Sequence, residues 1–308
     1  MSETVIPLFK MNGAGNKILV ADLRGSGKAL TGRMAAALGE NPMLHFDQLM
    51  AIGNRPSAAA DAYVTIFNID GSEAEACGNG TRCVADVMLN AAGIGNDGER
   101  LERLRIETVP GVLDVVRHDN GLLTVDMGVP KFGWRDIPLA EEFRDTRAIE
   151  LQVGPIDAPV LHSPSVVNIG NPHAIFWVRD DVNSYGLERF GPLLENHPIF
   201  PQRANISLAQ VVSRTKINLK VWERGVGLTL ACGSAACATV AAAARTGRTG
   251  RIVDVHLPGG VLTIEWTAED RLLMTGPITY EAAGMVNLDS LDWEMVETDD
   301  PFGFARSG

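Results

Sequence analysis

The sequence predicts an α+β protein made of two similar domains, which we interpret as the product of an internal duplication. Two segments share one pattern: FNIDGSEAEACGNGTRC at 67–83 and WERGVGLTLACGSAACA at 222–238, with their Ala-Cys-Gly triplets 155 residues apart. Gly-Asn dipeptides at 15–16 and 170–171 repeat at the same offset of 155. Most other patterned stretches alternate in polarity, as half-buried strands do. Chance matching of glycine turns does not readily give one offset twice.

Strands dominate the expected elements, and helices are few. β-branched runs bounded by Gly, Pro, Asn or Asp indicate strands at 62–67, 112–118, 122–127, 217–223, 253–257 and 261–266. Helical patterns follow the two cysteine segments, at 84–93 and 239–247, and a third lies at 31–38. We therefore expect each domain to be a mixed or antiparallel sheet wrapped on a central helix.

The duplication also sets the expected domain boundaries. We place an N-terminal domain at 1–130 and a C-terminal domain at 131–277, with 278–308 returning to the first domain. The active site is expected in the cleft between the domains. The carboxylate-rich stretch 289–300 is interpreted as a solvated surface tail, with a docking segment as the alternative.

Composition narrows the function classes. With 45% hydrophobic and 21% charged residues, the chain has an ordinary globular composition. A net charge of -11 disfavours binding to nucleic acid or anionic lipid, because both need clustered Lys and Arg. No apolar run approaches the length of a membrane span, and the first residues lack a secretory pattern, so we expect a cytoplasmic protein.

The four cysteines are expected to be reduced, and their spacing does not match a zinc site. They form two close pairs, Cys77 with Cys83 and Cys232 with Cys237. The six histidines are scattered along the chain, so no metal is expected. A GIGNDG stretch at 93–98 matches a dinucleotide-binding pattern but follows a helical run instead of a strand, and we interpret it as a loop.

Cys77 and Cys232 each precede a small Gly-containing turn and then a helix, and this placement suggests acid/base chemistry. A helix N-terminus favours anions and lowers the pKa of a nearby thiol. Two such thiols on opposite faces of a carbon could remove a hydrogen from one face and return one to the other. The alternative, inert buried cysteines, is our interpretation for Cys83 and Cys237. A disulfide between Cys77 and Cys232 is disfavoured in a cytoplasmic protein.

The chain resembles the diaminopimelate epimerase family along nearly its whole length, to about Gly276-Pro277. The two cysteine segments, together with GNPHAIF, PQRANI and MTGP, occur in the family's order. The resemblance implies a cofactor-independent enzyme that interconverts LL- and meso-diaminopimelate in lysine and peptidoglycan precursor synthesis. It implies that Cys77 takes the proton from the LL form and Cys232 from the meso form.

The resemblance also implies a set of substrate-binding residues. Each asparagine taken alone would be read as a turn or cap residue. The implied set is Asn16, Gln48, Asn68, Gly78, Asn79, Asn171, Asn205, Glu223, Arg224, Gly233 and Ser234. His173 and Glu223 are implied to lie near the cysteines and tune them. The partner is the small-molecule substrate, and a homodimer is our working expectation for the oligomer.

Two segments depart from the family pattern. Residues 12–18 read NGAGNKI where the family usually has His-Gly-x-Gly-Asn-Asp-Phe, and Ser234-Ala235 replace a common Thr-Gly. Serine keeps the hydroxyl, and alanine fits if its φ is negative. Two alternative functions are a two-thiol racemase acting on proline or hydroxyproline, and a thiol redox or metal-binding protein.

Overall fold

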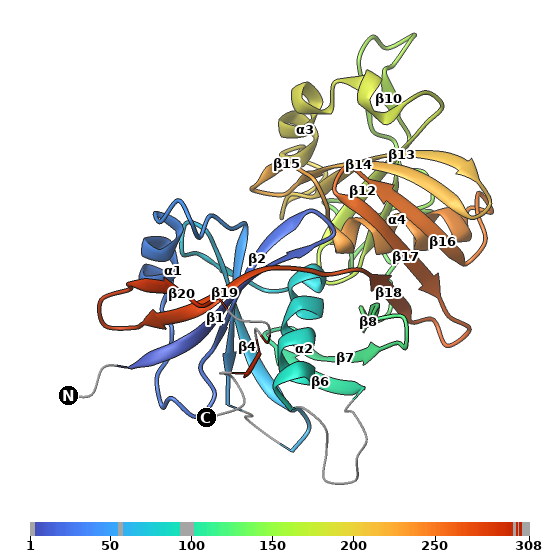
Figure 1. Cartoon of the computed structure of the whole chain (residues 1–308). Helices are drawn as coiled ribbons and strands as arrows, with labels where there is room; N and C mark the ends of the chain where they lie inside the picture. The colour runs from blue at the N-terminus through green and yellow to red at the C-terminus, as the bar shows by residue number, and fades with distance from the viewer. Residues whose placement is uncertain (1–3, 55–57, 93–101, 298–299, 301, 304–308) are drawn as a thin grey trace. The chain divides into compact units, whose positions relative to one another are not determined.

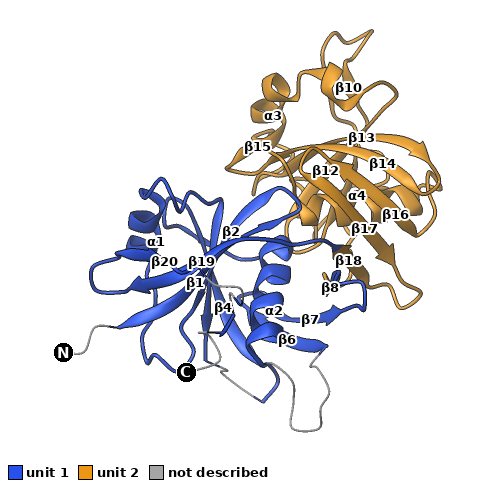
Figure 2. Ribbon diagram, viewed as in Figure 1, with its two compact units in different colours: residues 1–125, 276–308 blue, residues 126–275 orange. Residues whose placement is uncertain are grey.

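The computed structural model describes residues 4–54, 58–92, 102–297, 300 and 302–303. The chain divides into two compact units, residues 1–125 with 276–308, and residues 126–275 (Figure 2). The boundaries expected from the sequence, after residues 130 and 277, lie a few residues further along. The expected loop at 93–98 falls outside the described residues. None of the described helices combines the length and apolar character that a membrane crossing requires.

Unit 1 is a mixed sheet in the order β20-β19-β1-β2-β3-β4-β6-β7-β8, with β5 also paired to β4. Neighbours are antiparallel except for the pairs β2–β3 and β4–β6, which are parallel. Its elements are β1 (Val5–Gly13), β2 (Asn16–Asp22), α1 (Gly32–Gly39), β3 (Gln48–Gly53), β4 (Ala62–Asn68), β5 (Glu73–Ala74), α2 (Gly78–Ala92), β6 (Arg103–Thr108), β7 (Gly111–Arg117), β8 (Leu123–Asp126), β19 (Thr279–Asn287) and β20 (Trp293–Met295).

Unit 2 has a mixed sheet in the order β11-β12-β13-β14-β16-β17-β18, with β15 paired to β14 and a separate β9–β10 ladder. The pairs β12–β13 and β14–β16 are parallel. Its elements are β9 (Gln152–Val153), β10 (Leu161–His162), β11 (Ser165–Asn168), β12 (Pro172–Val178), η1 (Val182–Tyr185), α3 (Leu187–Glu195), β13 (Asn205–Ser213), β14 (Lys216–Glu223), β15 (Gly227–Thr229), α4 (Gly233–Arg245), β16 (Ile252–Leu257), β17 (Gly260–Trp266) and β18 (Leu272–Gly276).

The two units repeat one strand arrangement, as an internal duplication requires. The parallel pair β2–β3 corresponds to β12–β13, and β4–β6 corresponds to β14–β16. Even the register is shared, because Ile18 pairs with Gln48 in unit 1 and His173 pairs with Asn205 in unit 2. The predicted α+β class and the six predicted strands are confirmed.

Each sheet packs around one buried helix. Helix α2 contacts β1, β2, β3 and β6, and α4 contacts the corresponding strands of unit 2 (Figure 1). Helix α4 is rich in alanine, which needs little space, so nearly all of it can be buried. Both helices begin directly after their cysteines, at Gly78 and Gly233, so the predicted separate turns are wrong. The glycine-containing residues form the first helical turn instead.

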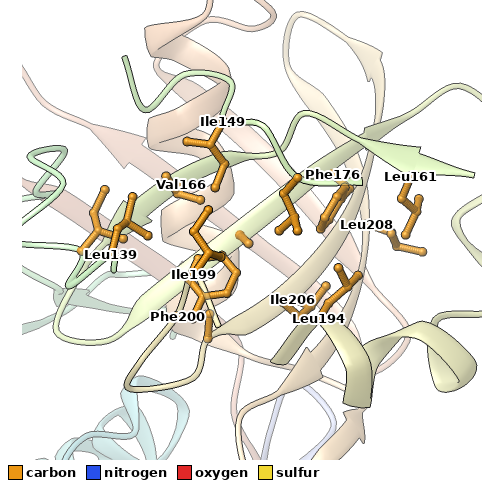
Figure 3. Close-up of a cluster of buried hydrophobic side chains, with 14 of the residues drawn as sticks. Leu139, Ile149, Leu161, Val166, Phe176, Leu194, Ile199, Phe200, Ile206 and Leu208 are labelled. Carbon is orange, nitrogen blue, oxygen red and sulfur yellow. The ribbon is translucent and has the colours of Figure 1, made fainter. Parts of the chain in front are cut away.

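Side chains on the two faces of β12 and β13 have different neighbours. Phe176, Ile206 and Leu208 point into a hydrophobic cluster that also includes Leu194 of α3 (Figure 3). Because side chains alternate along a strand, His173 and Trp177 lie on the opposite face of β12. One sheet face therefore packs on the α3 cluster, and the other, with the fully buried Ile175, Ala209 and His173, packs on α4.

Gly71, in the turn after β4, packs closely against the backbone of Gly32 at the start of α1. Gly71 has φ +82°, and a Cβ there would lie 2.2 Å from the carbonyl oxygen of Gly32. We expect Gly71→Ala to lower the free energy of unfolding by more than about 2 kcal/mol, because left-handed strain of roughly 1–2 kcal/mol adds to a backbone clash. The measurement is urea denaturation of the full chain.

Gly121→Ala is the matched control for this substitution. Gly121 has φ +79°, but a Cβ there would meet nothing within 4 Å, so only the backbone strain applies. Equal losses for the two variants would show that the Gly71–Gly32 contact is unimportant.

Candidate active site

Cys77 stands immediately before α2, and its sulfur contacts the helix N-terminus. The Sγ atom accepts a hydrogen bond from the Gly80 amide at 3.1 Å, and the Cys77 carbonyl accepts from the Thr81 amide and hydroxyl, both at 2.9 Å. The side chain is half-buried. Backbone N–H donors at a helix N-terminus stabilise negative charge on the group they contact. The thiol thus contacts a helix-end amide, as the sequence predicted, although no separate turn lies between Cys77 and the helix.

Cys232 occupies the corresponding position before α4 but has a different environment. It is almost fully buried, with Sγ 3.3 Å from the Ser234 hydroxyl. Burial raises the pKa of this thiol well above its ordinary value, and the negative charge of Glu223 raises it further. The Ser234 hydroxyl and the Ala235 amide lower the pKa only in part. Cys232 is therefore held in its protonated form at neutral pH.

A chain of polar contacts links Cys232 to a buried histidine. The ring Nε2 of His173 lies 2.8 Å from Asn171 Oδ1, and Asn171 Nδ2 lies 3.5 Å from the Ser234 hydroxyl. Burial, with a smaller effect of Arg224, lowers the pKa of His173 to about 3. The imidazole is thus neutral, and donation from Nε2 to the amide oxygen leaves Nδ1 unprotonated. Among the described residues, Nδ1 has no hydrogen-bond partner.

Arg224 and Glu223 are fixed by the strands around them. Asn205 accepts from the Arg224 amide at 2.9 Å and donates to the Pro172 carbonyl at 3.1 Å, which ties the end of β14 to β12. The Arg224 guanidinium donates to the Gln202 carbonyl at 3.1 Å. Glu223 accepts from the Thr229 hydroxyl at 2.5 Å. Seven of the expected residues, together with His173, thus gather at one end of the unit 2 sheet.

Unit 1 brings together a second group of expected residues. Gln48 donates to Asn68 at 3.3 Å, and Asn68 donates to the Ser72 hydroxyl at 3.0 Å. The buried Asn79 accepts from the guanidinium of Arg82 at 3.0 Å. Asn16 follows the hairpin turn from β1, and its buried side-chain oxygen has no partner within the described ranges.

The two segments that depart from the family pattern fit their local backbone. Gly13 packs against the first turn of α2, since a Cβ there would come within 3.0 Å of the Asn79 carbonyl oxygen. The turn at Ala14-Gly15 has positive φ at both residues, and the Asn12 side chain accepts from the Gly15 amide at 2.7 Å. Ala235 is helical with negative φ, so the alanine fits as expected.

Two supporting residues were missed by sequence reasoning. Glu195, at the end of α3, is buried and accepts from the Trp222 indole at 2.7 Å and the Gly225 amide at 2.8 Å, so it anchors the turn that carries Arg224. Arg82 is fully buried and orients Asn79. Charged residues are mostly exposed, and nothing in the sequence around Glu195 or Arg82 indicates that these two side chains are buried.

The remaining cysteines match their expected structural role. Cys83 and Cys237 lie fully buried inside α2 and α4, and none of the four described cysteines forms a disulfide. Burial raises the pKa of Cys83 far above its ordinary value, which makes this thiol unreactive. Within the described residues, no three His, Cys, Asp or Glu side chains come together as metal ligands would.

Comparison with known proteins points to one family. The model of the diaminopimelate epimerase family matches residues 8–133 and 165–281. A diaminopimelate epimerase of Rhizobium meliloti (strain 1021) is 59% identical over 283 residues, 92% of each chain. One from Chelativorans sp. (strain BNC1) is 57% identical over 92% of this chain and 95% of its own.

Among solved structures, the likeness is one of fold. A hydroxyproline epimerase from Agrobacterium vitis, with bound trans-4-hydroxy-L-proline, has a TM-score of 0.62 at 17% identity and covers 99% of both chains. A phenazine biosynthesis protein of the PhzF family from Bacillus anthracis has a TM-score of 0.61 at 20% identity, covering 93% of this chain and 99% of its own.

The contact between Glu223 and Cys232 predicts a pH shift. Replacing Glu223 by Gln removes a negative charge that disfavours the thiolate, so the pKa of Cys232 should fall while burial keeps it above the ordinary value. We expect the pH midpoint for alkylation of Cys232, followed by mass spectrometry, to move to lower pH. Thr229→Val is the control, since it removes the hydrogen bond to Glu223 but keeps the charge. Equal midpoints in wild type and Glu223→Gln would contradict the electrostatic account.

Proposed function

The chain belongs to the diaminopimelate epimerase family and epimerises diaminopimelate, and we propose that Cys77 and Cys232 are the two acid/base groups of this isomerase. The observation that carries the proposal is their matched placement: each cysteine directly precedes the N-terminus of a buried helix in its own unit. No other described cysteine has this position.

The different environments of the two thiols support a direction of proton transfer. Inversion needs one thiolate to remove the α-proton and one thiol to deliver a proton to the other face. Cys232, buried beside Glu223, holds its proton and so serves as the donor in this state. Cys77 is then the base, the direction implied for the LL form. After the step, Cys77 carries the proton, Cys232 is the thiolate, and the meso product has the inverted centre.

The carbanion formed between the two proton transfers needs electrostatic stabilisation. We assign this role to the first-turn amides of α2 and α4, at Gly78, Asn79, Gly233 and Ser234, which would hold the reacting carboxylate. Gly78, Asn79 and Gly233 are buried in these turns, so helix packing sets the direction of their N–H groups. Such preorganised donors are worth about 3–4 kcal/mol each where one has been removed from an active site.

The far end of the substrate is assigned to the other polar side chains. Diaminopimelate carries a second carboxylate and ammonium group, and Arg224 can bind a carboxylate through its guanidinium. Its backbone is held by Asn205, and its side chain is already anchored at the Gln202 carbonyl. Asn16, Gln48, Asn68 and Asn171 offer both donors and acceptors for the remaining groups.

The sequence comparison disfavours the racemase alternative, while the cellular location and the oligomeric state remain proposals. A proline or hydroxyproline racemase has the same fold, but its solved relative shares only 17% identity with this chain, against 59% for the diaminopimelate epimerase of Rhizobium meliloti. The cytoplasmic location and the homodimer rest on the sequence alone, and light scattering of the purified protein would measure the oligomer.

Single substitutions of the two cysteines test the assignment. We expect Cys77→Ala and Cys232→Ala each to reduce kcat by at least about 10²-fold, because each removes one of two obligatory proton carriers. Circular dichroism should show an unchanged fold. Cys83→Ala and Cys237→Ala are matched controls within the same helices, and they should keep near-normal turnover. Wild-type activity in either Cys77→Ala or Cys232→Ala would disprove the two-thiol mechanism.

Incorporation of deuterium from the solvent distinguishes a mechanism with two acid/base groups from a mechanism with one. LL-diaminopimelate incubated in deuterated water, with no added cofactor, should give a meso product with deuterium at the inverted α-carbon, because the donating thiol exchanges with solvent. Recovered LL substrate should stay unlabelled early in the reaction, as seen by mass spectrometry. Early label in the recovered substrate would point to a single base. Turnover of proline in place of diaminopimelate would favour the racemase.

A further inference from the structure

Unit 2 contains a hollow that the catalytic residues do not line. Its volume is about 540 Å³, within the range of roughly 300–1,000 Å³ found for small-molecule sites. It lies next to the C-terminal end of β12, the residues that follow the C-terminus of α4, and the middle of β13. Its lining residues are Arg147, Ala148, His162, Ser163, Trp177, Val178, Arg179, Ala209, Val211 and Arg248.

The hollow is distant from the proton-transfer groups within the same unit. Arg179 is six residues beyond His173 along β12, which corresponds to roughly 20 Å at about 3.3 Å per residue. Helix α4 has 13 residues, roughly 20 Å at about 1.5 Å per residue, with Cys232 before its start and Arg248 after its end. Strand and helix thus place the hollow at the opposite end of unit 2 from Cys232.

Positive charge gathers around this hollow in a protein whose net charge is -11. Three arginines and a histidine line it, and none of its described lining residues is acidic. Arg147 is held by Asp145 through Nε and Nη2, at 2.8 Å in the shorter contact, which fixes the guanidinium in place. Neither Arg179 nor Arg248 forms an ion pair with a carboxylate among the described residues.

Further contacts hold the arginines and the aromatic wall together. Arg214 donates to the carbonyls of Gly247 and Thr249 on either side of Arg248, which adds another guanidinium nearby. The Arg248 guanidinium lies 4.7 Å from the Trp177 ring centroid. The Trp177 indole donates to the Ser165 hydroxyl at 2.9 Å, so its ring cannot turn freely. Arg147, Arg179 and Arg248 are exposed, and only Arg147 has an ion pair with a described carboxylate, so the guanidiniums of Arg179 and Arg248 are accessible to an anion.

We propose that this hollow binds a small organic polyanion, whose phosphate or carboxylate groups engage Arg147, Arg179 and Arg248. Guanidinium groups bind both oxyanions through paired N–H donors. Trp177, with the small apolar residues of β13, provides a surface for the apolar or planar body of the ligand. Diaminopimelate itself is a poor fit, since its two ammonium groups would find no carboxylate in the lining. The proposal is independent of the assignment of the two thiols.

Isothermal titration of the full chain tests this site, at about 0.15 M salt to screen weak surface attraction. The probes are pyrophosphate, citrate and adenosine 5′-diphosphate. We expect at least one to bind with 1:1 stoichiometry and a Kd below about 1 mM. Binding of pyrophosphate without citrate would identify a phosphate ligand, and the reverse a polycarboxylate. Tighter binding of the nucleotide than of pyrophosphate would show that the Trp177 surface contributes.

Substitution of the arginines shows whether the probe binds in this hollow. Arg179→Ala and Arg248→Ala should each weaken binding about tenfold or more, whereas Arg144→Ala, an exposed arginine outside the hollow, should leave the affinity unchanged. All three should keep epimerase activity, which reports an intact fold. The proposal is overturned if no probe binds, if the Arg179→Ala/Arg248→Ala double variant binds normally, or if saturating diaminopimelate displaces the probe.

Discussion

Burial of one complete helix inside each sheet is the constraint on which the rest of the structure depends. A buried helix needs small, apolar or hydrogen-bonded residues all round, as the alanines of α4 and the Arg82–Asn79 pair of α2 show. Its first turn cannot shift without disturbing the surrounding strands. The orphan amides of that turn are then fixed in position and partly shielded from water. A thiol placed one residue earlier meets the positive end of the helix in a defined orientation. The acid/base chemistry proposed for both cysteines would therefore depend on helix packing more than on any unusual side chain.

The two cysteines differ in how deeply they are buried and in which groups surround their sulfur atoms. Cys77 is half-buried, and its sulfur accepts a hydrogen bond from the Gly80 amide. Cys232 is buried beside the Glu223 carboxylate, and both effects favour its protonated form. The polar chain from Ser234 through Asn171 to His173 exists in unit 2, where the neutral imidazole adds no positive charge that would ionise the thiol. The neighbours thus give two residues of the same type different protonation behaviour, as the proposed pairing of one acid with one base requires.

Much of this could be predicted from the sequence, for identifiable reasons. The repeated Ala-Cys-Gly segments gave the duplication, and alternation in polarity gave strands such as β7 and β14. Helix starts were misplaced, because the glycines that open α2 and α4 are usually read as turns. Helix α3 escaped prediction, since it is short and contains Pro192. The buried charge of Glu195 could not be foreseen, because its partners Trp222 and Gly225 lie 27 and 30 residues further along the chain. Arg82 bonds Asn79 in the same helix, but nothing in the sequence marks this arginine as buried.

The shared register of the parallel strands has an evolutionary consequence. Ile18 and His173 occupy equivalent points in the two ladders, each fully buried, yet one is a hydrocarbon and the other an imidazole. Since the two copies are encoded separately, a substitution in one leaves the other untouched. Duplication within a single polypeptide thus freed each half to diverge, which a symmetric assembly of identical subunits could never do.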